Sequence, residues 1–367
     1  MVSATTHPTA TASRKRLART AAAFLAAGAL ALAGCSGDTS GSSASADADA
    51  PAELQKMLVV TFLPLESFSF TPEMFAYSGG YFEKHGLDVQ LQPVQGTAAA
   101  IQSLLGGATP ITRASTVDVM PAMEAGQEIT AIGTMAYKSN LRVISVDGNP
   151  IESPEDMEGE VMGMGSIGGT SEKMLNLALG ASDVPLDSVT RQSVPVTAAT
   201  LEVVRQGQLG GYIVSLDTSL AIEQQNDDAI VTDAGLGDAP DIQTWITTAK
   251  NLEDPEKVEQ MEAFMAAIQE AVQFVIDDAE NDFDNVLQIM RDSGDWNFPA
   301  LQDDDVSRAA LEIYTTQTWV DQSGDAALLE NNIDAWTSAY DTYVRAGLLE
   351  GGHDPEEWIT NDHVPAG

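Results

Sequence analysis

Short apolar runs alternate with helically spaced apolar positions along residues 57–250, and this pattern predicts strands alternating with helices. The predicted strands are 58–62, 87–93, a short strand reaching 111 or 112, 129–134, 141–146, 161–165, 189–194, 211–214, 229–231 and 243–248. The predicted helices are 72–84, 96–105, 116–124, 170–179, 197–206 and 217–223. Such alternation indicates an α/β protein with mostly parallel sheets.

From residue 255 onward the chain is predicted to be mainly helical. Its clearest helical face carries apolar residues at helical spacing, and a place in the core explains all of them. They are Met261, Phe264, Met265, Ile268, Val272 and Val275.

Two α/β blocks followed by a helical return predict two domains, the first of them discontinuous. We expect domain 1 to combine residues 56–146 and 241–367, and domain 2 to occupy 147–240. The expected crossings between them, 145–150 and 234–242, would act as a hinge. Ligands of open α/β sheets bind at the carboxyl ends of the strands, so we expect the ligand cleft between the domains.

The N-terminus has the pattern of a secretory signal. Basic residues at 14–16 and 19 precede an apolar stretch, 20–34, that is too short to span a membrane. The segment 32–35, Leu-Ala-Gly-Cys, resembles the lipobox of bacterial lipoproteins and contains the chain's single cysteine. We therefore expect a signal peptide at 1–34, a lipid anchor on Cys35 at the outer face of the cell membrane, and a flexible tether over 35–55.

Composition narrows the function further. The 367 residues include 55 acids against 17 basic residues, for a formal net charge of −38. That charge argues against nucleic acid, which needs basic residues to displace its counterions. One cysteine excludes a disulfide scaffold, and the histidines at 85, 353 and 363 lack metal-ligand spacing, so we expect no metal and no cofactor.

Several segments resemble one family. Residues 80–89, GYFEKHGLDV, resemble its "G-x-F-x-x-x-G-L-D-V" segment, and 98–107 with 114–126 resemble its next helix and strand–helix. Residues 153–163 resemble its "S-x-x-D-L-x-G-K-x-I-G" entry into domain 2, except for Met157, Glu160 and Met162. The family is that of ABC-importer solute-binding proteins for nitrate, sulfonates, taurine and thiamine precursors. The resemblance implies a two-domain, type II periplasmic-binding-protein fold.

Candidate ligand-binding residues lie mostly on loops that follow predicted strands. They are Phe68, Ser69, Gly96, Thr97, Arg113, Ser115, Thr116, Ser166, Gly168, Gly169, Thr170, Ser215, Asp217 and Trp245. Helix N-termini favour anionic oxygens, and glycines there allow a ligand close to the backbone. Ordinary helix capping and core packing explain many of the same residues equally well.

Two kinds of ligand remain open. Arg113 is the one cation on a predicted cleft loop and could clamp a sulfonate, carboxylate or phosphate, although a surface arginine neutralised by nearby acids fits as well. Trp245, Tyr137 and Met135 could instead stack a flat heterocycle, or belong to the core.

The resemblance implies an exported solute-binding lipoprotein that works as a monomer and delivers a small solute to ABC permease subunits. A ligand-binding sensor lipoprotein is an alternative. An enzyme related to thiamine-pyrimidine synthesis is another, but its Cys-rich motif is absent. A G-x-S-x-G hydrolase motif also fails, since Met164 stands where its first glycine must be.

Overall fold

The computed structural model describes residues 53–62, 64–165, 167–237 and 239–366, which belong to one compact unit. The predicted anchor, Cys35, and the signal and tether before residue 53 lie outside the described residues. No helix of the described part is long and apolar enough to cross a membrane.

The first lobe is built on a five-stranded sheet with the order β2-β1-β3-β10-β4. Strand β1 is parallel to β2 and β3, whereas β10 runs antiparallel to β3 and β4. The bounds are β1 Gln55–Thr61, β2 Leu87–Pro93, β3 Thr112–Ser115, β4 Ile129–Ala136 and β10 Gln243–Thr248.

The second lobe repeats this plan with the order β7-β6-β8-β5-β9. Strand β6 is parallel to β7 and β8, and β5 is antiparallel to β8 and β9. The bounds are β5 Leu141–Val146, β6 Val161–Met164, β7 Thr190–Ser193, β8 Gly211–Ser215 and β9 Ala229–Thr232. The chain therefore passes between the sheets twice, through residues 137–140 and 233–242, which we call the first and second crossings.

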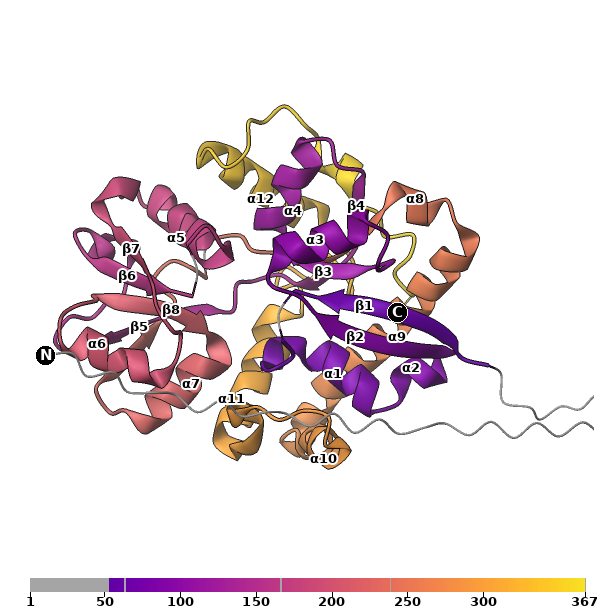
Figure 1. Ribbon diagram of the computed structural model, residues 1–367, viewed down its shortest axis with the longest axis horizontal. Coiled ribbons are helices and arrows are strands. Elements are labelled where there is room, and N and C mark those ends of the chain that lie inside the picture. The colour runs from indigo at the N-terminus through magenta and orange to yellow at the C-terminus, as the bar shows by residue number, and fades with distance from the viewer. Residues whose placement is uncertain (1–52, 63, 166, 238, 367) are drawn as a thin grey trace, which may run out of the picture. The chain divides into compact units, whose positions relative to one another are not determined.

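Helices flank both sheets, and α2 and α3 pack beside β2 and β3 (Figure 1). The first lobe holds α1 Thr71–Ser78, α2 Tyr81–Lys84, α3 Thr97–Leu105 and α4 Thr116–Glu124. The second holds α5 Thr170–Ala181, α6 Leu201–Arg205 and α7 Leu216–Gln225. The C-terminal part adds α8 Ala249–Leu252, α9 Pro255–Asp277, α10 Asp284–Ser293, α11 Asp304–Ile313 and α12 Ile333–Arg345.

The predicted face of the long C-terminal helix is confirmed as core. All six of its apolar residues are fully buried on α9. They join one apolar cluster with α1, α10 and α11, while a second cluster combines α3, α4 and α12 with α5 of the second lobe. The lobes thus share apolar packing as well as two crossings.

One predicted helix, 72–84, is divided in two. Gly79 ends α1, and Gly80, at φ +73°, begins α2 in a left-handed conformation that favours glycine. A Cβ atom on Gly79 would lie 2.6 Å from the Tyr81 ring and 2.9 Å from the Phe75 carbonyl oxygen. The break lets the chain turn tightly where helical spacing alone predicted continuity.

The predicted boundary at residue 146 falls at the wrong end of a strand. Strand β5 had been assigned to domain 1, but Leu141 pairs with Ser215 of β8, and Val143 pairs with Thr232 of β9. The first crossing therefore precedes β5, and the expected crossing at 145–150 lies inside the second lobe. An apolar strand pattern does not reveal which sheet the strand will join.

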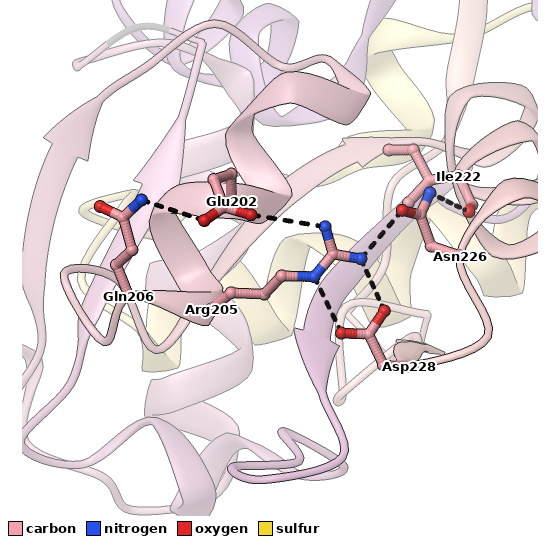
Figure 2. A network of polar contacts seen from close by, with 6 residues as sticks. All are labelled: Glu202, Arg205, Gln206, Ile222, Asn226 and Asp228. Carbon is pink, nitrogen blue, oxygen red and sulfur yellow. Dashed lines mark hydrogen bonds and ion pairs between the residues drawn. The ribbon is translucent and has the colours of Figure 1, made fainter.

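An exposed polar network fastens α6 to the loop before β9 (Figure 2). Arg205 donates to both carboxylate oxygens of Asp228, with Nε and Nη2 at 2.8 and 2.6 Å, and Nη2 also donates to Asn226 at 2.9 Å. Such a paired contact fixes geometry more than it adds stability at an exposed position.

Candidate functional site

The lobes meet where the loop after β1 reaches the start of α7. Ser67 donates a hydrogen bond of 2.8 Å to Oδ1 of Asp217, which lies in the first turn of α7. The Ser67 hydroxyl also accepts from the Ser69 amide at 3.2 Å. Asp217 is only 3% exposed, and burial raises its pKa to about 6 against the opposing hydrogen bonds. Burial of the Asp217 carboxyl between the lobes therefore favours its protonated form.

Tyr314 adds a buried hydroxyl beside this contact. It follows α11, and its oxygen accepts a hydrogen bond of 3.0 Å from the Asn140 side chain in the first crossing. Burial raises the pKa of Tyr314, and the nearby charge of Asp217 raises it further. The phenol therefore stays protonated and remains available as a hydrogen-bond donor.

Arg113 lies under the loop after β1 and is only 2% exposed. Its Nη1 donates to the Ser69 carbonyl at 3.0 Å, and its Nε lies 3.4 Å from Glu73 Oε1. Its guanidinium carbon is 4.6 Å from the Phe70 ring centroid and 5.6 Å from that of Phe62. Of the two alternatives that the sequence left open for Arg113, the surface position is therefore wrong, and the arginine's charge is offset by a buried carboxylate.

Glu73, on α1, was not found from the sequence. Burial raises its pKa to about 7, with the Arg113 charge pulling in the opposite direction. Burial likewise lowers the pKa of Arg113. The sequence contains little indication of the Glu73–Arg113 pair. Glu73 lies in the first turn of a predicted helix, 40 positions before Arg113.

The end of β3 is tied to the second crossing. Ser115 donates to the carboxylate of Asp241 and accepts from the Val117 amide at 3.2 Å, which caps α4. Asp241 is 3% exposed, and burial, with the Asp118 charge adding to it, raises its pKa to about 6. Thr116 lies beside it, with Oγ1 2.9 Å from the Tyr343 hydroxyl.

Helices α4 and α5 make a further contact between the lobes. Thr170 Oγ1 donates to Asp118 Oδ2 at 2.8 Å, and Lys173 pairs with Oδ1 of the same carboxylate. The Gly168 amide donates to the Glu172 carboxylate, and Gly168 has a φ of +79°. Gly169 is the N-cap position of α5. Ser166, which was predicted in the same loop, lies outside the described residues.

Other predicted residues have local or core roles. Phe68 is buried edge-on against Phe298, with ring centroids 5.3 Å apart. Ser215 Oγ lies 3.0 Å from Thr218 Oγ1. Gly96, at φ +86°, begins α3, and the next residue, Thr97, is 7% exposed.

The proposed stacking residues point to the core. Trp245 is 1% exposed and packs edge-on against Phe264, with centroids 5.0 Å apart. Met135 is fully buried, and the Tyr137 hydroxyl donates to the Glu330 carbonyl at 2.5 Å. Core packing, which the sequence left open, accounts for Trp245 and Met135.

Among the described residues, one cavity lies on the first lobe and another at the crossings between the lobes. A hollow of about 740 Å³ lies along the edge strand β2 and is lined in part by Pro64, Tyr77 and Trp296. A cavity of about 90 Å³ lies at the crossings, with Lys138, Arg142 and Asp233 among its walls.

The sequence missed several residues that build this interface. They are Ser67, Glu73, Asp118, Asn140, Lys173, Asp241 and Tyr314. Ser67 adjoins a predicted loop, and Asp241 lies within a predicted crossing, so position gave a partial signal for both. Tyr314 comes from the helical return, for which the sequence pattern predicted only packing.

Two sheets, each completed by one antiparallel strand and joined by two crossings, define a two-domain periplasmic-binding-protein fold. The periplasmic aliphatic sulphonate binding protein SsuA from Escherichia coli matches it with a TM-score of 0.59 at 12% identity, over 83% of this chain and 97% of that one. The periplasmic nitrate-binding protein NrtA from Synechocystis PCC 6803 gives 0.57 at 14% identity, over 85% and 87%.

An enzyme shares the same fold. The desulfurization enzyme DSZB matches with a TM-score of 0.53 at 12% identity, over 84% of this chain and 97% of that one. At these identities the likenesses show the fold alone. No curated protein matches the chain. The family described as NMT1/THI5 like matches residues 67–281, more than half of the sequence, so the chain belongs to that family.

Proposed function

We propose that this protein is the extracytoplasmic solute-binding component of an ABC importer, which captures a small solute between its lobes and delivers it to the permease. The observation that carries the proposal is the lobe interface. There, Ser67 in the loop after β1 contacts α7 of the other lobe, and Asp118 on α4, the helix that follows β3, contacts α5. Family membership supports it, as do solved structures of this fold described as sulphonate and nitrate binders.

Capture would use the two crossings as a hinge. The second crossing contains Ala234 and Gly235 at φ +44° and +82°, a local conformation that residues other than glycine seldom adopt. The contacts from Ser67 to Asp217, and from Asp118 to Thr170 and Lys173, would hold the closed state. A solute that binds the closed state more tightly would shift the lobes toward it.

Delivery would use the lipid anchor. We propose that the signal is cleaved before Cys35 and that the acylated protein works as a monomer at the outer face of the cell membrane. The lipobox resemblance supports this, since the chain's single cysteine occupies the position that lipidation requires.

A binding role fits the interface chemistry better than the catalytic role that the fold of DSZB allows. The interface holds carboxylates, hydroxyls and a buried tyrosine. The described histidines make their contacts elsewhere: His85 with Glu270, His353 with Trp358 and His363 with Glu262. None of these pairs an imidazole with an interface hydroxyl, the arrangement that activates a nucleophile.

The proposal is tested by solute-induced stabilisation and by uptake. A solute at 100 times its dissociation constant should stabilise residues 36–367 by about 2.7 kcal/mol, which is several degrees in melting temperature. Cells that lack the protein should lose uptake of that solute, and the native chain should restore uptake where Cys35→Ser does not. Binding without any loss of uptake would favour the sensor alternative, and conversion of the solute would favour an enzyme.

A further inference from the structure

The lobe interface contains two buried carboxylates without a cationic partner. Asp217 and Asp241 are each 3% exposed, and their side-chain hydrogen-bond donors are neutral hydroxyls, those of Ser67 and Ser215 for Asp217 and that of Ser115 for Asp241. Neither forms an ion pair within the described part of the chain. Burying a carboxylate without a counter-charge is costly, and this interface carries that cost twice.

Three cations beside this interface have acidic neighbours, and a fourth, Lys138 of the first crossing, is exposed to solvent. Arg113 lies against Glu73, and Lys173 pairs with Asp118. Arg142 donates to the Leu141 carbonyl at 2.8 Å, and the charge of Asp233 acts on it against the effect of burial. The charges of Arg113, Lys173 and Arg142 are therefore offset locally, and among the described residues no ion pair joins Lys138 to Asp217 or Asp241. The two aspartates leave a surplus of negative charge.

The two carboxylates lie where a ligand of this fold would be held. Ser67 follows β1 and Ser115 ends β3, and these strands are neighbours in the first sheet. Their serine-bound carboxylates come from α7 of the second lobe and from the second crossing. A ligand held by both would therefore contact both lobes and the hinge.

Gln243 gives an independent indication of what the ligand must provide. It begins β10, is 8% exposed, and its Oε1 atom has no hydrogen-bond partner among the described residues. It lies directly opposite Ser115 in the β3–β10 pair, so the two side chains stand on one face of the sheet. A buried amide oxygen beside the Ser115–Asp241 pair calls for a donor.

We propose that the solute is a small organic cation with several N–H groups, such as a primary ammonium, an amidinium or a guanidinium, held by Asp217, Asp241 and Gln243. This inference rests on the proposed function, because it assigns the ligand class of the same interface. It departs from the sulphonate and nitrate named for the solved structures of this fold. An anion placed here would meet two uncompensated carboxylates in a poorly solvated site, where their repulsion is strongest.

The first test compares probes that differ in charge but little in shape. Residues 36–367 are titrated by calorimetry and thermal shift with putrescine, agmatine and benzamidine. Matched neutral or anionic probes are 1,4-butanediol, benzamide, ethanesulfonate and nitrate, with the aminopyrimidine of thiamine as a heterocycle. We expect at least one cation to bind and to raise the melting temperature, and its neutral counterpart to have no effect.

The second test locates the charge. Asp217→Asn and Asp241→Asn should each weaken the cation at least tenfold, and Gln243→Leu should weaken it several-fold. The control Asp341→Asn removes one negative charge from an exposed position on α12 and should change affinity less than twofold. The ligand-free Asn variants should melt at or above the native temperature near neutral pH, because each loses a buried charge without a partner. If the two carboxylates instead stabilise the fold, the Asn variants should melt below the native temperature.

The pH dependence of the unmodified protein tests the same point without any substitution. Cation affinity should fall as the pH drops below about 6, where both carboxylates become protonated. The titratable groups that face them are Tyr314 for Asp217, and Asp118 and Tyr343 for Asp241. Neither phenol ionises near that pH, because burial raises both of their pKa values.

The outcomes separate this inference from the proposed function. Tight binding of an anion or of the neutral heterocycle, unchanged in both Asn variants, would overturn the cation class and leave the binding function standing. Failure of every cation would also overturn it. Failure of the whole panel, together with unchanged uptake in cells lacking the protein, would count against the function as well.

Discussion

At the residue scale, the role of a buried charged side chain depends on the groups that contact it. Arg113 follows a predicted strand, and such a position in the sequence suggests a clamp for an anion. The structure instead surrounds it with Glu73, two aromatic rings and the Ser69 carbonyl. These four contacts use the guanidinium, so its charge organises the loop after β1.

The buried carboxylates predict an unusual pH dependence of stability. Burial raises the pKa of Glu73 from 4.5 to about 7, and those of Asp217 and Asp241 from 3.8 to about 6. The folded state therefore binds more protons than the unfolded state between these values. The stability that these groups contribute is fully present below about pH 4 and is lost as the pH rises toward 7.

This pH effect is measurable by urea denaturation of residues 36–367 between pH 4 and 7.5. The free energy of unfolding should decrease steadily across that range, by about 1.4 kcal/mol for each unit by which a group's pKa is raised. The double variant Asp217→Asn, Asp241→Asn should show a shallower decrease. A free energy of unfolding that rises steadily toward neutral pH would contradict the protonation states assigned to the interface.

At the element scale, the pattern of apolar residues located most strands and helices because burial of one face imposes a period of two or 3.6. Helix α4, for example, was predicted over its exact bounds, Thr116–Glu124, despite Pro121. The break between α1 and α2 was not predicted, because helical spacing indicates a continuous helix and does not show that Gly80 adopts a left-handed conformation. The sheet membership of β5 escaped because pairing with Ser215 and Thr232 depends on residues far along the chain.

The break between α1 and α2 predicts opposite effects for two Gly→Ala substitutions. Gly79→Ala should destabilise the protein by about 1–3 kcal/mol, because the new Cβ would overlap the Phe75 carbonyl oxygen and the Tyr81 ring. Gly180→Ala is the control: it lies within α5, its Cβ would meet nothing within 4 Å, and it should stabilise by roughly 0.4–1 kcal/mol. Thermal melts of both variants test this prediction. Equal changes in melting temperature would contradict the steric role assigned to Gly79.

At the scale of the whole molecule, residues distant in sequence form the interface. Asp217 meets a serine 150 positions earlier, and Asp241 meets one 126 positions earlier. The sequence pointed to the loops after β1 and β3 and to the start of α7, because strand ends are identifiable from pattern. The partners across the interface depend on how the lobes pack, which no local pattern contains.

From the contact between α4 and α5 we predict that Lys173 shifts the equilibrium between the open and closed states toward the closed state. Lys173→Met removes the ion pair to Asp118 and leaves only the hydrogen bond from Thr170. Because the lysine is 30% exposed, solvent screens the pair, and its loss should cost about 1 kcal/mol of closure. Solute affinity should then fall about fivefold, and the radius of gyration of the solute-free protein should increase in X-ray scattering.

Lys250→Met is the matched control, since it removes an exposed lysine from α8 and should leave both measurements unchanged. Saturating solute should return the Lys173→Met variant to the native radius, because binding energy compensates for the lost ion pair. A variant with native radius but weaker binding would place Lys173 at the solute itself. A variant with native radius and native affinity would show that the α4–α5 contact has no part in closure, and the contact from Ser67 to Asp217 would remain of the two proposed to hold the closed state.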